Sequence, residues 1–261
     1  MQFSEVLGSM ARDADGWIAR VPADWLQGRS TFGGLQSALA LRALRSVAPE
    51  HPLRVLQTTF IAPVGEGAMR IVPSVLRAGK TTIHAEAKIF DGSTLAALVV
   101  GVFGKSRPSE IRVVPRQPVV DRSRIVALPR GAGFVPAFLQ HFDTRWLRGG
   151  PPGSGATSTE AVVEVDLRDT GPVTEAHVVA IADVTPPVAL SMLKASSPGS
   201  SLTWTLEMLR EEAFEALPLG TWRLDVELVA GGGGYTSQSE IVWGPGGEPI
   251  AISRQSMVVF G

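Results

Sequence analysis

Apolar and polar residues alternate through long segments in the first half of the chain. From Ile83 to Ile89 every second residue is apolar, which is the period of a half-buried strand. The pair "DG" at 91–92 follows, and it is a short-range signal for a β-hairpin. The pattern therefore predicts two antiparallel strands over 80–92 and 93–104.

The same series of predicted elements occurs twice. Each series is a helix followed by four strand-like segments. The first helix spans 33–47 and its strands 53–63, 69–79, 80–92 and 93–104; the second helix spans 182–195 and its strands 200–209, 221–231, 235–247 and 248–261. The segments "LRAG" and "LVAG" end at Gly79 and Gly231, 231 − 79 = 152 positions apart, and "VFG" closes both halves. This shared order indicates an internal duplication.

A helix with an apolar stripe packs against an apolar surface, and one face of an antiparallel sheet can provide that surface. We therefore predict an α+β fold, a double hotdog in which two long antiparallel sheets each wrap around a central helix and lie edge to edge. The expected boundaries are an N-terminal hotdog at 1–106, a proline- and arginine-rich linker at 107–133 and a C-terminal hotdog at 134–261. The segment 159–169 predicts one extra strand.

Composition narrows the classes of protein further. Of the 261 residues, 44% are hydrophobic and 19% are charged, which is typical of a globular protein. The net charge of −1 and the lack of a Lys/Arg cluster argue against a nucleic-acid partner. The longest apolar run, 95–103, has nine residues, whereas roughly 20 are needed to span a bilayer. The chain start lacks a secretory pattern, so we expect a cytoplasmic protein without membrane insertion. Exposed sheet edges would favour a homo-oligomer.

Several catalytic devices have no support in the sequence. There is no cysteine, which excludes disulfides, thiol nucleophiles and cysteine-based zinc sites. No "Gly-x-Ser-x-Gly" elbow is present, which argues against a serine-hydrolase triad. The four histidines have no metal-ligand spacing, so no metal is expected.

One carboxylate stands out by its position. In "HVVAIADVTPP" (177–187), Asp183 lies within an apolar run that ends at Pro186 and Pro187. An Asp before proline at a helix start is a common N-cap, which is one interpretation. The other is a functional anion, which the amide N–H groups of the helix start would help keep ionised. The residues alone leave both open. In the repeat, Gly34 occupies the matching position.

The order of these segments resembles the double-hotdog acyl-CoA thioesterases of the thioesterase II type. The likeness covers nearly the whole chain. It depends on "FGGLQSALALRAL", "TTFIAP" and "VLRAGKTT" in the first half, and on "AIADVTPPVAL", "SSLTWTLEML" and "EPIAISRQSMVVFG" in the second.

The resemblance implies three residues that jointly hold a water molecule. They are Asp183, Ser201 and Gln255, all in the second half. The sequence departs from the family at Thr203, where an acid is usual, and at Trp204, where histidine is usual. Thr203 is an alternative hydroxyl, because residues two apart on a strand share a face.

The glycine pair at the start of the first helix is also of interest. Gly33 and Gly34 would let backbone N–H groups approach a substrate, as an oxyanion or pantetheine contact. Close packing at a helix start explains the pair equally well.

The expected function is hydrolysis of an acyl-CoA thioester to a free acid and coenzyme A. Asp183 would act as general base on water, which requires no covalent intermediate and no cofactor beyond the coenzyme A of the substrate. The alternative is a non-catalytic acyl-CoA-binding hotdog protein, which the departures at Thr203 and Trp204 favour. A hydratase or dehydratase has less support, because no Asp–His pair occurs at the expected helix start.

Overall fold

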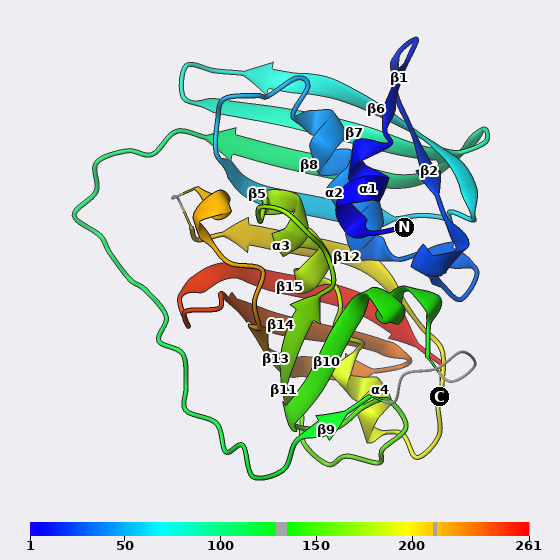
Figure 1. Ribbon diagram of the computed structural model, residues 1–261, viewed down its shortest axis with the longest axis vertical. Coiled ribbons are helices and arrows are strands. Elements are labelled where there is room, and N and C mark those ends of the chain that lie inside the picture. Colours follow the sequence, from blue (N-terminus) through cyan, green and yellow to red (C-terminus); the bar gives the residue numbers. More distant parts are fainter. Residues whose placement is uncertain (129–134, 211–212, 261) are drawn as a thin grey trace.

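The computed structural model describes residues 1–128, 135–210 and 213–260 (Figure 1). Within these residues, 13 strands form one antiparallel sheet, and β3 (Leu26–Gln27) pairs separately with β4 (Ser30–Thr31). The order across the large sheet is β1 (Ala11–Asp13), β2 (Gly16–Val21), β6 (Gly67–Ala78), β7 (Thr82–Asp91), β8 (Thr94–Gly104), β5 (Leu53–Phe60), β12 (Gly199–Met208), β15 (Pro249–Val259), β14 (Tyr235–Trp243), β13 (Trp222–Gly232), β11 (Glu160–Leu167), β10 (Phe142–Arg148) and β9 (Val126–Ala127).

The two sheets predicted to lie edge to edge form one continuous sheet through both halves, so the prediction of two separate sheets is not confirmed. Strand β5 of the first half pairs with β12 of the second, and Val55–Thr59 lie opposite Thr203–Glu207. Each of these strands would otherwise be an edge with unpaired backbone N–H and C=O groups. Joining the edges satisfies those groups within one chain.

The strands on the two sides of this junction follow the same order, as the internal duplication predicts. From β5 the sheet continues through β8, β7, β6 and β2, and from β12 it continues through β15, β14, β13 and β11. The predicted extra strand over 159–169 is present as β11, and its counterpart in the first half is β2. The six-residue β2 is too short to give a clear periodic signal, so the sequence did not indicate it.

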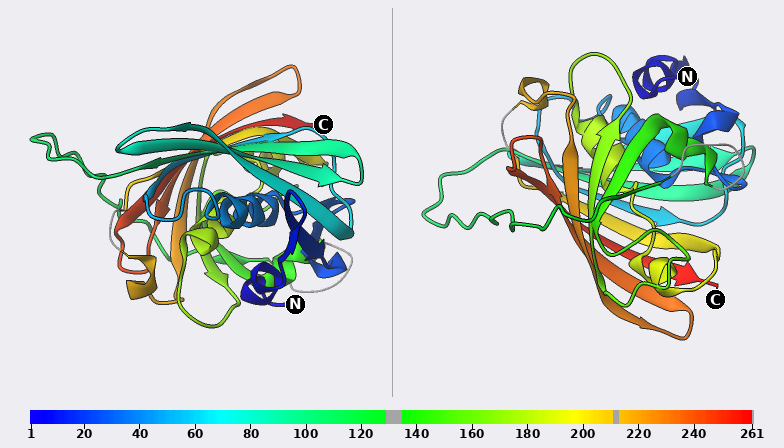
Figure 2. Two further views of the ribbon diagram at one scale, coloured as in Figure 1. Left: turned by 90° about the horizontal axis from the view of Figure 1, so that it is seen from above. Right: turned by 60° about the horizontal axis from the view of Figure 1, so that its bottom comes forward.

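Four α-helices occur in the described residues: α1 (Phe3–Gly8), α2 (Gly33–Leu44), α3 (Glu175–Ala182) and α4 (Val188–Met192). Three short 3-10 helices, η1 (Ala23–Trp25), η2 (Ala137–His141) and η3 (Phe214–Ala216), complete the described elements. Helix α2 packs on β6, β7 and β8 and against α3, and both helices lie on the same side of the curved sheet (Figure 2).

The second predicted helix, 182–195, is not continuous. Helix α3 ends at Ala182, residues 183–187 are not helical, and α4 is a separate short helix. Pro186 and Pro187 provide no backbone N–H groups for a continuous helix. Asp183 is therefore the C-cap of α3 and not the N-cap of the helix that follows.

The core lies between the sheet and the helices. Four tryptophans, Trp25, Trp204, Trp222 and Trp243, are among the largest fully buried side chains, in agreement with a packing role. The segment 105–125 leaves this body as an extended loop (Figure 1), and Val119 within it is 98% exposed. The proposed boundaries at 106–107 and 133–134 stay predictions, and residues 129–133 of the linker lie outside the described residues.

Candidate active site

Three side chains from separate elements meet beside the start of α2. The amide nitrogen Nε2 of Gln255 donates to Oδ1 of Asp183 at 2.9 Å and to Oγ of Ser201 at 2.8 Å. Gln255 comes from β15, Ser201 from β12 and Asp183 from the end of α3. The structure thus brings together the three residues that the family resemblance implies.

The backbone at the start of α2 completes the surroundings of Asp183. The N–H of Gly34 donates to its carboxylate. The first N–H groups of a helix have no partner within the helix, so they favour an anion there. The stabilising helix start is therefore that of α2. The expectation that it would be the helix following Asp183 is wrong, because that acid ends α3.

The glycine pair gives two close approaches that a side chain would block. A Cβ on Gly33 would lie 2.7 Å from Oδ2 of Asp183 and 3.0 Å from the ring of Phe60. A Cβ on Gly34 would lie 2.6 Å from the ring of Phe32 and 3.1 Å from the Cα of Ala180, on α3. Gly33 therefore makes room for the carboxylate, and Gly34 for the packing of α2 on α3.

A β-bulge decides between the two candidate hydroxyls on β12. Ser201 pairs with Met257 and Thr203 with Ser256, so Leu202 is an extra residue between two consecutive partners. A bulge reverses the alternation of side chains along a strand. Thr203 is consequently exposed and Ser201 faces Gln255. The prediction that both hydroxyls share a face is wrong for this reason.

Burial controls the acidity of Asp183. Loss of hydration disfavours the charged carboxylate and raises its pKa to about 7, although the hydrogen bonds from Gln255 and Gly34 act in the opposite direction. A carboxyl group with a pKa near neutrality can both accept and release a proton under ordinary conditions.

A fully buried carboxyl group, that of Glu240, lies close enough to Asp183 for the two to interact electrostatically. Glu240 on β14 is 3% exposed, and its Oε2 accepts a 2.7 Å hydrogen bond from Oγ1 of Thr185. Burial raises its pKa to about 8, with repulsion from Asp183 and Asp225 adding to the shift. Sequence reasoning missed this residue. The available signal was that polar Gln238 and Glu240 share the inward-facing alternation of β14 with Val242.

Histidine does not complete a dyad with Asp183. The ring of His177 accepts from the N–H of Thr174 at Nδ1 and bonds Asp169 through Nε2 at 3.2 Å. Among the described residues, no cluster of three or more His, Cys, Asp or Glu side chains could hold a metal ion. No described helix is long and apolar enough to cross a membrane.

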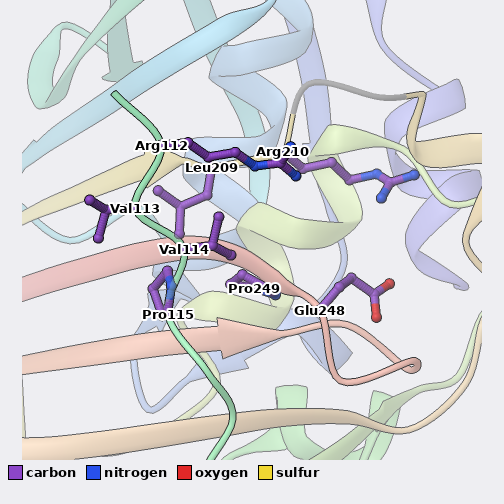
Figure 3. A pocket seen from close by; sticks show the side chains of 8 residues that line it. All are labelled: Arg112, Val113, Val114, Pro115, Leu209, Arg210, Glu248 and Pro249. Atoms are coloured by element: carbon purple, nitrogen blue, oxygen red, sulfur yellow. The ribbon is translucent and has the colours of Figure 1, made fainter. Parts of the chain in front are cut away.

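A separate pocket of about 270 Å³ opens between the linker and the end of β12 (Figure 3). Its lining consists of Arg112, Val113, Val114, Pro115, Leu209, Arg210, Glu248 and Pro249. None of the three converging residues lines this pocket.

Comparison with known families agrees with this arrangement. The family described as acyl-CoA thioesterase N-terminal domain matches residues 21–104, and the one described as acyl-CoA thioesterase C-terminal domain matches residues 115–259. The chain belongs to the acyl-CoA thioesterase family. The predicted family is thereby confirmed, and thioester hydrolysis is the activity that membership supports.

Solved structures share the fold of this thioesterase family member at low sequence identity. A conserved protein of unknown function with a hotdog fold from Alicyclobacillus acidocaldarius has a TM-score of 0.88 at 20% identity, with 99% of this chain and 98% of that chain covered. An acyl-CoA thioesterase II, TesB2, from Mycobacterium marinum has a TM-score of 0.71 at 15% identity, with 99% and 98% covered. The tesB protein of Mycobacterium avium subsp. paratuberculosis has a TM-score of 0.79 at 14% identity, with both chains fully covered at 100%. No curated protein matches the chain. These likenesses establish the hotdog fold.

Proposed function

We propose that this protein hydrolyses acyl-CoA thioesters with Asp183 as the general base. The observation that carries the proposal is the amide group of Gln255, which bridges the partly buried carboxyl group of Asp183 and a serine hydroxyl. We interpret the two halves as a double hotdog in which the C-terminal copy carries the catalytic residues.

The three polar groups have complementary hydrogen-bonding capacity. Gln255 uses its amide N–H groups on Asp183 and Ser201, so the hydroxyl hydrogen of Ser201 remains available to donate. In the proposed reaction, Asp183 takes a proton from a water molecule while the oxygen of that water molecule bonds to the carbonyl carbon of the thioester. The C–S bond then breaks, and the proton passes to the departing sulfur. The products are a free acid and coenzyme A.

The start of α2 offers a donor for the oxyanion. Since the N–H of Gly34 is already bonded to Asp183, we assign this part of the substrate-binding role to Gly33. Its N–H lies in the first turn and has no partner within the helix. An oriented backbone N–H that meets developing charge is worth about 10²-fold or more in rate.

The non-catalytic alternative rested on Thr203 and Trp204. Thr203 faces away from the site, and Trp204 is buried with its Nε1 donating to Ser253. Neither departure removes Asp183, Ser201 or Gln255, so both are compatible with catalysis.

A thiol-release assay tests the proposal. Wild type should release coenzyme A from members of a panel of short, medium, branched and aromatic acyl-CoAs. Asp183→Asn should lower kcat by about 10²–10⁴-fold, because it removes the base and keeps the shape. Glu207→Gln, an exposed carboxylate on β12, is the matched control and should not change the rate. Binding of acyl-CoA without turnover would support the non-catalytic alternative instead. Cytoplasmic location and self-association remain predictions.

A further inference from the structure

Strand β14 holds the segment that carries the catalytic base at two points. Thr185, two residues after Asp183, donates to Oε2 of Glu240 at 2.7 Å. The N–H of Val188, at the start of α4, donates to Oε1 of Gln238 at 3.1 Å. Both acceptors lie on the inward face of β14 and are 3% exposed. The break between α3 and α4 is therefore anchored from the sheet.

Only one of the two carboxyl oxygens of Glu240 takes part in this anchor. Its second oxygen, Oε1, is buried and has no hydrogen-bond partner among the described residues. An ionised carboxylate in such a place would leave one of its charged oxygens without a donor, which is strongly unfavourable in a buried site. A neutral carboxylic acid with its proton on Oε1 leaves a neutral O–H group unpaired, which costs less than a charged oxygen without a donor.

The charged surroundings favour the neutral form too. In the described part of the chain, the ionisable groups that act on Glu240 are Asp183, at the end of α3, and Asp225, on β13. Both are acids. The nearest cation on that strand, Arg223, is already paired with Asp225 through two hydrogen bonds of 2.6 and 2.8 Å. Among the described residues, no counter-ion is thus provided for a negative charge on Glu240.

We propose that Glu240 is a positioning residue for the base: it fixes the 183–187 segment through Thr185 and stays uncharged, so that it adds no second negative charge beside Asp183. The proposal rests on the proposed function, since it assigns Glu240 a role in the same site. A misplacement of about 1 Å at a reacting group can cost about 10²-fold in rate, which makes such an anchor worth keeping despite the cost of burying an acid.

Two substitutions separate the anchor from general packing. Thr185→Val keeps the shape and removes the hydroxyl, and Glu240→Leu removes the acceptor. Each should lower kcat about tenfold or more, with KM within about twofold, because the base is displaced while the substrate contacts remain. Thr185→Ser should restore the rate, and Ser239→Ala, at the neighbouring outward position of β14, should leave it unchanged. Full kcat in folded Thr185→Val and Glu240→Leu would overturn the anchoring role.

Glu240→Gln tests the charge. It keeps an acceptor for Thr185 and cannot ionise. If Glu240 is neutral while Asp183 titrates, the variant should keep kcat and the midpoint of its pH–rate profile within about 0.3 pH units, since no charge was removed. A midpoint that falls by about one unit or more would show that a charge on Glu240 had been repelling Asp183, and the proposal would fail.

A readout independent of turnover distinguishes this failure from that of the proposed function. In protein with ¹³C-labelled Glu carboxyl groups, the resonance absent from Glu240→Gln should still report the protonated form at pH 7. If it does and no acyl-CoA is hydrolysed, the proposed function fails while the protonation state of Glu240 stands. If that carboxyl group titrates near its ordinary range, the inference fails whether or not the protein is a catalyst.

Discussion

The acid–base behaviour of Asp183 follows from its burial. Water stabilises a carboxylate far better than the interior does, and two hydrogen bonds recover only part of that loss. A base whose pKa lies near the working pH combines a populated ionised form with a useful affinity for the proton. The same burial therefore affects both rate and stability.

The pH dependence of the rate is the first prediction at this scale. Because Asp183 acts as a base only when ionised and its pKa is raised to about 7, kcat/KM should rise about tenfold per pH unit below 7 and level off above it. A stopped-flow or plate assay from pH 5 to 9 checks this. A flat profile across that range would contradict the assignment of the base.

The stability of the wild-type protein depends on pH in the direction opposite to its rate, and Asp183→Asn tests this. Between the ordinary pKa of 3.8 and the folded value of about 7, the folded protein binds the extra proton, so the stability associated with Asp183 is present at low pH and is lost as pH rises through 7. The variant lacks this loss. Relative to wild type, its free energy of unfolding should improve by about 2–3 kcal/mol between pH 5 and pH 8. Urea unfolding at the two pH values measures it, and no change in the difference would argue against a buried, titrating Asp183.

At this scale the sequence supports much of the site, with clear gaps. Asp183, Ser201 and Gln255 could be named because each lies in a segment that resembles the family. The outward direction of Thr203 could not, because a bulge depends on how β12 pairs with β15. Glu240 was also out of reach, since alternation shows which residues face inward and not what they meet there.

Among the elements, the meeting of α2 and α3 sets the geometry of the site. The start of α2 was correctly predicted at Gly33, with its glycine pair. The single helix over 182–195 was wrong, because apolar periodicity continues across the two prolines although backbone hydrogen bonding does not. The resulting gap between α3 and α4 is what leaves Asp183 facing the first turn of α2.

Gly33→Ala is the prediction at the scale of elements. The added methyl group would enter the space between Asp183 and the ring of Phe60, so either the base or the helix start must move. We expect kcat to fall about tenfold or more, with a loss of stability of about 1–3 kcal/mol. Gly8→Ala, in open space at the end of α1, is the matched control; it should leave kcat unchanged and should not lower the stability. Wild-type kinetics in Gly33→Ala would show that this contact is not critical.

At the scale of the whole molecule, the two halves are joined by more than the linker. The sheet is continuous through β5 and β12. Helix α1 reaches the second half, where Asp169 accepts from the backbone N–H of Ser4 at 2.8 Å and from its Oγ at 2.7 Å. The repeated order of elements could be predicted from the sequence. The edge-to-edge placement of the two sheets was also predicted, but not which strands pair at the junction, because that depends on which edges meet in space.

Asp169 provides a test of this cohesion. Burial opposes its ionisation, but hydrogen bonds from His177, Ser4 and Thr170 outweigh this and lower its pKa. Its contribution is therefore present above pH 4 and is lost as pH falls through the lowered value. Asp169→Ala should reduce the free energy of unfolding at pH 7 by about 2–4 kcal/mol in a single transition, measured by calorimetry. Its pH–rate midpoint should match wild type, and a shift would mean that Asp169 acts on the catalytic base.

Because the loop 105–125 is exposed, we expect the fold to tolerate proteolytic cleavage within it. A protease that severs the peptide bond beside Arg112 or Arg116 would cut one covalent connection and leave the β5–β12 ladder and the α2–α3 contact untouched. The nicked product should therefore migrate as two fragments on a denaturing gel while eluting as one particle from a sizing column. Two separately synthesised polypeptides divided at this loop should associate into one particle. One would supply the Asp183 carboxylate and the other Gly33 and Gly34, which lie beside it.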